Sequence, residues 1–197
     1  MKHKDLRREI KFRALPLEET NDQMILEGKA IVYGEKTKLF SFDNQDYFEV
    51  IEQGALKNAD LSDVFLKYNH ADNIMVMART RNNTLFIEER EDGVYIKAFP
   101  ANTTAGKDLY ELVKRGDIDK MSFAFTEEEE HFDEETRTWT VKNIKKMYDV
   151  AAVTVPAYSN TELYARRKCD LEKRISDLEK LQAQRKRISI LNSLGGK

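Results

Sequence analysis

The chain has 197 residues, 41% of them apolar, enough to bury one core of ordinary size, which excludes disorder over its whole length. Its 33 basic and 35 acidic residues leave a net charge of −2, which argues against a general nucleic-acid binder. The single cysteine, Cys169, and three histidines exclude an internal disulfide and leave no Cys/His cluster for structural zinc, so we expect a reducing cytoplasm. We also expect neither a signal peptide nor a membrane span, because the longest apolar run, 74–78, is far short of the roughly 20 residues that a span needs.

Short apolar and aromatic runs separated by turn residues predict a mostly β body. A helix is expected between Thr103 or Thr104, which can cap it, and Gly116, which can end it, and a brief helix is expected over 52–56. The expected strands, of which 85–89 and 94–99 form a hairpin, are 24–33, 47–51, 63–68, 85–89, 94–99, 121–126, 137–142 and 145–155. We expect an α+β protein with a closed or nearly closed β-barrel and helices outside it.

The charge and the apolar pattern of the chain change near residue 160. Residues 161–197 carry ten basic and five acidic side chains, a net +5, which leaves −7 on residues 1–160. Apolar residues recur there at helical steps of three and four, at Leu171, Ile175, Leu178 and Leu181. We predict a globular domain over 1–160 and a basic amphipathic helical tail over 161–197. Two interpretations of this tail are open. It is a helix that packs on the body or lies in solvent, or it is a segment that docks on a helical partner.

Three residues of the predicted body are candidates for chemistry. His70 follows an apolar strand and lies in a polar turn. His3 lies in a charged terminal segment, and His131 lies in the acidic segment 127–135, which we expect to be a solvated hairpin or loop. Ser122 alternates with Met121, Phe123 and Phe125, so that the large side chains face the core and the serine faces the other way.

Asp149 is the only charge in the apolar segment 147–155, and a carboxylate buried there needs a partner such as an imidazole N–H. Each of the three residues also has an ordinary structural explanation: a satisfied histidine, a serine bonded to a carbonyl, or an aspartate at a wet strand edge. A serine becomes nucleophilic only with a base in reach and a third group that orients the base.

The order and spacing of several segments resemble the prohead maturation proteases of tailed bacteriophages, a family related to the herpesvirus assemblins. The resemblance extends from about residue 9 to 162, and the segments that carry it are 48–56, 66–70, 77–80, 84–85, 108–118, 121–125 and 149–158. It implies a barrel of the herpesvirus-protease type with His70 as the base, Ser122 as the nucleophile and Asp149 as the third member. Asp149 stands where relatives often carry Glu, one methylene longer.

The resemblance implies a serine endopeptidase that acts by acyl transfer. We expect no cofactor and no metal, because the sequence has no glycine-rich loop of the kind that binds phosphate and no metal-site spacing. Its oxyanion donors are expected among the backbone N–H groups after Pro156, or from Arg166 and Arg167 by analogy with assemblins. Implied substrates are the scaffolding protein or the scaffolding segment of the major capsid protein, and the protease itself, inside the assembling procapsid in the host cytoplasm. We expect the protein to bind neither nucleic acid nor a membrane. The sequence leaves open whether it forms a homodimer.

Two other functions remain open at this point. The same barrel with a merely structural His70, Ser122 and Asp149 would serve as an inactive assembly factor that binds scaffold. The same three residues would also suit a hydrolase of small esters, which needs a deep apolar pocket, whereas a protease needs a shallow groove edged by an exposed strand.

Overall fold

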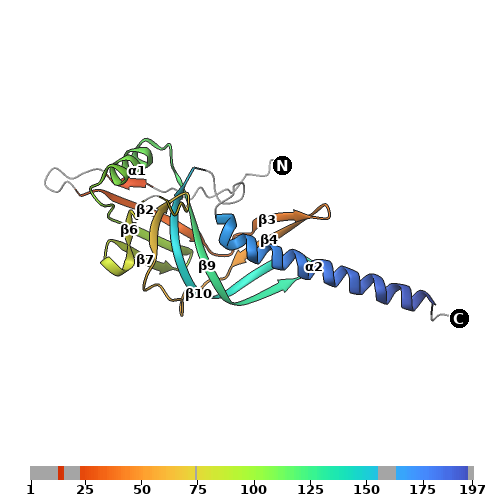
Figure 1. The fold of residues 1–197 in the computed structure, drawn as a ribbon. Helices are drawn as coiled ribbons and strands as arrows, with labels where there is room; N and C mark the ends of the chain where they lie inside the picture. The colour runs from red at the N-terminus through yellow and green to blue at the C-terminus, as the bar shows by residue number, and fades with distance from the viewer. Residues whose placement is uncertain (1–12, 16–22, 74, 155–162, 195–197) are drawn as a thin grey trace, which may run out of the picture. The chain divides into compact units, whose positions relative to one another are not determined.

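The computed structural model describes residues 13–15, 23–73, 75–154 and 163–194 (Figure 1). The chain divides into two compact units, residues 1–160 and residues 161–197. The second unit contains one described element, the helix α2 (Leu163–Leu194), in agreement with the helical periodicity of this segment. No helix among the described residues is both long enough and apolar enough to cross a membrane.

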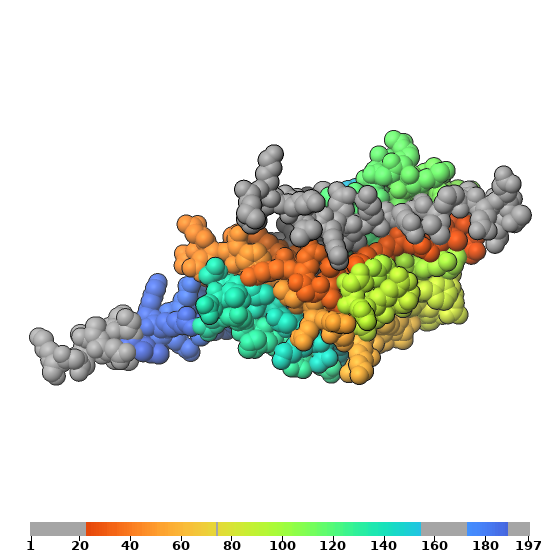
Figure 2. All heavy atoms as spheres, turned by 180° about the vertical axis from the view of Figure 1, so that it is seen from behind, coloured from red at the N-terminus to blue at the C-terminus, as the bar shows by residue number. Residues whose placement is uncertain are grey.

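The first sheet of the body is antiparallel and has the strand order β1-β2-β8-β7. Its strands are β1 (Arg13–Leu15), β2 (Ile25–Val32), β7 (Leu85–Arg90) and β8 (Gly93–Ala98). β7 and β8 form the expected hairpin, which lies beside β2 on the face shown in Figure 2. A Cβ atom at Gly93 would lie 2.1 Å from the carbonyl oxygen of Ile31, so only glycine allows the hairpin to approach β2 this closely.

The second sheet is built around one long strand. Its strands are β3 (Thr37–Phe42), β4 (Gln45–Ile51), β5 (Phe65–Tyr68), β6 (Ala78–Arg79), β9 (Lys120–Asp133) and β10 (Thr138–Val153). One edge of β10 pairs in parallel with β4 along 138–141 and with β5 along 149–152. The other edge pairs with β9 in antiparallel fashion, and β3 and β6 extend the sheet beyond β4 and β5.

The helix α1 (Thr104–Arg115) begins and ends where the sequence predicts. The hydroxyl of Thr103 accepts a hydrogen bond from the Gly106 N–H at 3.2 Å, and Gly116 ends the helix in the left-handed region with φ +83°. Leu109, Tyr110 and Val113 form its buried side. A short 3₁₀ helix, η1 (Thr80–Asn82), connects β6 to β7.

The described part of the chain is mostly β with two α-helices, which confirms the α+β class. The expected barrel is not confirmed, because neither sheet closes on itself among the described residues: β2 lies near β9, yet no ladder joins the two sheets. The brief helix expected over 52–56 is a series of turns. The acidic segment 127–135, expected as a solvated hairpin or loop, belongs to the β9–β10 hairpin: 127–133 are the end of β9 and 134–137 form the turn. Residues 128–131 are exposed, and Glu129 pairs with Lys142 at 3.3 Å.

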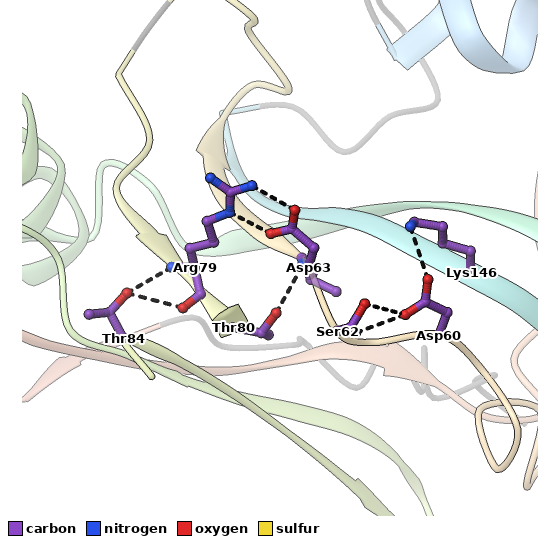
Figure 3. Close-up of polar contacts among 8 residues, drawn as sticks. Asp60, Ser62, Asp63, Arg79, Thr80, Thr84 and Lys146 are labelled. Atoms are coloured by element: carbon purple, nitrogen blue, oxygen red, sulfur yellow. Dashed lines mark hydrogen bonds and ion pairs between the residues drawn. The ribbon is translucent and has the colours of Figure 1, made fainter. Parts of the chain in front are cut away.

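Polar side chains fix the segment before β5 to its neighbours (Figure 3). Arg79 in β6 donates two hydrogen bonds to the carboxylate of Asp63, the second at 2.6 Å to Oδ2, and this pairing holds the pKa of Asp63 below its usual range. Asp60 accepts bonds from Ser62 at 2.6 Å and from Lys146 at 2.9 Å, which likewise lower its pKa. These bonds therefore attach the segment before β5 to Arg79 on β6 and to Lys146 on β10.

We expect Asp63→Asn to lower the midpoint of thermal unfolding at pH 7. A carboxyl group whose pKa is lower in the folded state stabilises the fold above its unfolded pKa, and this stabilisation is lost as the pH falls through the folded value. The difference in midpoint between variant and wild type should therefore shrink when the pH falls below the ordinary aspartate value of 3.8. Asp43→Asn, in an exposed turn, is the matched control, and an equal loss at pH 7 and pH 3 would contradict the argument.

Candidate active site

One face of the second sheet packs into the core, and the other carries the three candidate residues. Core positions are Leu66 on β5, Met121 and Phe125 on β9, and Val150 and Ala152 on β10. The residues between them point to the opposite face because side chains alternate along a strand. On that face Ser122 and Ala124 of β9 lie opposite Ala151 and Asp149 of β10, which in turn lie beside Lys67 and Phe65 of β5.

A bulge in β10 decides on which face Asp149 lies. Met147 pairs with Phe125, yet Asp149 pairs with Ala124, so Tyr148 is one extra residue in the ladder. Without this extra residue Asp149 would pair with Phe123 and share the core face with it. The bulge therefore turns the carboxylate out of the apolar core and onto the face of Ser122.

His70 reaches the same place from the end of β5. Asn69 and His70 form a tight turn after Tyr68, and the imidazole Nδ1 is hydrogen-bonded to Oδ1 of Asp149. Both side chains are buried, with 6% and 5% of their surface exposed. A carboxylate only accepts hydrogen bonds, so Nδ1 carries the proton and neutral His70 has its lone pair on Nε2.

The Nε2 atom of His70 is buried and has no hydrogen-bond partner among the described residues. A buried nitrogen without a partner is uncommon in folded proteins and calls for an explanation. Here the unpaired atom is the one that a general base would use to take a proton.

Ser122 is buried on the same face, one strand away from Asp149. Its hydroxyl is not bonded to Nε2, since that nitrogen has no partner. The structure thus joins His70 to Asp149 and leaves Ser122 beside them without the third contact. Catalytic contacts are often open in an enzyme without substrate and tighten when it binds.

Lys67 places a cation beside the buried carboxylate. Its Nζ lies 3.8 Å from Oδ2 of Asp149 and also pairs with Asp72, and only 14% of the lysine side chain is exposed. Asp72, Lys67, Asp149 and His70 thus form a row in which acidic and basic groups alternate. Two positively chargeable neighbours reduce the cost of burying Asp149.

Sequence reasoning did not single out Lys67 or Asn69 as site residues. The signal available for Lys67 was a lone charge in the apolar strand 64–68, the same signal that identified Asp149. His131 lies exposed on β9, away from the core. The expected oxyanion donors after Pro156, and the side chains of Arg166 and Arg167, lie outside the described residues. Within the described part of the chain, no group of three His, Cys, Asp or Glu side chains gathers that could hold a metal ion.

Comparison with protein-family models gives one match, which agrees with the chemistry of these groups. Residues 9–174 match the model of the caudovirus prohead serine proteases. No curated protein and no solved structure gives a significant match. The matched range includes His70, Ser122 and Asp149 together with all the described strands.

The site geometry predicts different stabilities for two alanine variants. Asp149→Ala removes the partner of Nδ1 and leaves His70 buried with both nitrogens unpaired, which should lower the free energy of unfolding by about 1–3 kcal/mol. Ser122→Ala should change it by no more than about 0.5 kcal/mol, because no hydrogen bond from the hydroxyl to a described residue is lost. Urea unfolding at pH 7 measures both values, and equal losses would contradict this arrangement.

Proposed function

Because the chain belongs to the caudovirus prohead serine protease family, we propose that it is the serine endopeptidase that cleaves capsid or scaffold protein during phage capsid maturation. The observation that carries this proposal is the buried His70, whose Nδ1 is bonded to Asp149 and whose Nε2 is unpaired on the face that holds Ser122. This is the tautomer that a general base needs.

In the proposed reaction, Ser122 Oγ attacks the carbonyl carbon of the scissile peptide bond while His70 Nε2 takes the hydroxyl proton. The protonated imidazole then gives that proton to the leaving amine, and an acyl-enzyme ester remains on Ser122. Water, deprotonated by the same nitrogen, attacks the ester carbonyl; the bond to Ser122 Oγ breaks, the imidazolium returns the proton to Oγ, and the new carboxyl terminus leaves. Asp149 holds the ring by Nδ1 throughout and stabilises the positive charge that forms on it.

The mechanism requires Ser122 Oγ to approach Nε2 when substrate binds. Ala124 and Ala151 flank the serine on this face, and such small side chains leave room for a substrate backbone. The proposed substrates are the scaffolding protein or the scaffolding segment of the major capsid protein, and the protease itself.

The proposed triad predicts that Ser122→Ala and His70→Ala each abolish cleavage. Wild type expressed with its scaffold and major capsid protein should yield shortened products, detected by gel electrophoresis and located by mass spectrometry of the fragments. Each variant should lose at least about a thousandfold in rate. Ser41→Ala is the matched control, because Ser41 lies on β3 and its hydroxyl bonds to exposed Asp46 at 2.7 Å. Processing retained in both active-site variants would overturn the triad.

We further propose that the basic segment 161–197 recruits the enzyme to an acidic, helical scaffold. Its net charge of +5 contrasts with −7 on residues 1–160, and α2 presents these charges along a continuous helix. Replacing Arg185, Lys186 and Arg187 with glutamine keeps helix propensity and removes three charges.

We expect this triple variant to enter procapsids at a reduced copy number, and a chain lacking 161–197 to lose about tenfold or more, the effect of about 1.4 kcal/mol of binding energy. Quantitative mass spectrometry of purified procapsids measures the copy number. Normal packaging of the truncated chain would refute the recruiting role, and normal packaging of the triple variant alone would refute the role of charge.

A further inference from the structure

The turn that carries His70 has an unusual backbone. Asn69 and His70 both lie in the left-handed region, with φ +48° and +55°, and the Ala71 N–H donates to the Tyr68 carbonyl at 2.9 Å. These features define a type I′ turn with Asn69 and His70 at its two central positions. Asparagine suits the first position, whereas the second normally takes glycine, so the backbone of His70 is strained.

Contacts from the end of β10 hold this strained turn. The Asn69 N–H donates to the Ala152 carbonyl at 2.9 Å, and the Asn69 side-chain oxygen Oδ1 accepts from the Thr154 N–H at 3.2 Å. The third contact is the bond between His70 and Asp149. β10 and the residue that follows it thus contact the turn at three points, 149 and 152 on the strand and 154 just after it, and Asn69 makes two of these contacts.

We propose that Asn69 is a positioning residue: its side-chain oxygen, bonded to the Thr154 N–H, holds the strained turn in the orientation that aims His70 Nδ1 at Asp149 and leaves Nε2 unpaired. Asn69 touches no reacting atom and acts through His70. The inference deepens the proposed function and rests on it for the catalytic effect. The effect on the placement of His70 does not depend on catalysis.

Substitutions at position 69 separate the hydrogen bond from the backbone conformation. Asn69→Gly keeps easy access to the left-handed region and removes the side chain together with its Oδ1 acceptor. Asn69→Asp keeps both the acceptor and the tolerance for this conformation. Asn83→Gly is the matched control, because Asn83 has φ +56° and ends the 3₁₀ helix η1.

The first measurement is the proton NMR signal of the His70 Nδ1–H, assigned by its loss in His70→Ala. Wild type, Asn69→Asp and Asn83→Gly should show a downfield signal typical of a proton bonded to a carboxylate. Asn69→Gly should lose it or shift it clearly upfield, while retaining the circular dichroism spectrum of the wild type. An unchanged signal in Asn69→Gly would overturn the inference.

The second measurement is the rate at which a fluorophosphonate probe labels Ser122 in the full chain, with Ser122→Ala as the blank. Labelling of Asn69→Gly should be about 10- to 100-fold slower than wild type, because a small misplacement of a catalytic group has effects of this size. Asn69→Asp and Asn83→Gly should stay within about threefold of wild type. An unchanged rate in Asn69→Gly would overturn the catalytic part of the inference.

The two failures can be told apart. Absence of labelling in the wild type would count against the proposed function, while the NMR comparison would still decide whether Asn69 places His70. If the wild type is labelled at Ser122 and Asn69→Gly matches it in both measurements, the role of Asn69 is refuted. The proposed protease function is then unaffected.

Discussion

The one-residue offset at Tyr148 in the ladder between β9 and β10 decides which side of the sheet carries Asp149. Side chains alternate along a strand, so a ladder without this extra residue would send the carboxylate into the core beside Phe123. There it would be buried away from His70, and the imidazole would lose the partner of Nδ1. The arrangement of the site therefore depends on this one β-bulge. Met147 and Val150, on either side of the bulge, both have their side chains in the core.

β10 and Thr154, the residue that follows it, supply nearly every contact that organises the site. Asp149 bonds to His70, Ala151 lies opposite Ser122, and the backbone at 152 and 154 holds the turn through Asn69. Groups from three strands thus take their positions from one segment of six residues. The relative positions of His70, Asp149 and Ser122 therefore depend on the registers of β5, β9 and β10 and on the turn after β5, and not on closure of the sheets elsewhere.

Much of this arrangement follows from local patterns, and the rest depends on pairing between distant segments. Alternation predicts most strands, and Thr103 and Gly116 mark the ends of α1 because capping is local chemistry. His70, Ser122 and Asp149 stand out by residue type and context. The bulge at Tyr148 could not be predicted, because a bulge depends on the partner strand. For the same reason the sequence does not decide between a hairpin and a loop for the acidic segment 127–135, and it does not show that no ladder joins the two sheets among the described residues.

Two unfavourable features coincide at His70, and neither has a purely structural purpose. Its backbone occupies a position that glycine or asparagine would fill without strain, and its Nε2 is buried without a partner. A histidine retained only for packing could be replaced by a residue that avoids both costs, each about 1–3 kcal/mol. The bond to Asp149 and the two contacts of Asn69 offset these costs and keep the ring in one orientation. A preorganised base with a free lone pair is what acyl transfer requires, so the strain at this turn favours a catalytic role for His70 over a structural one.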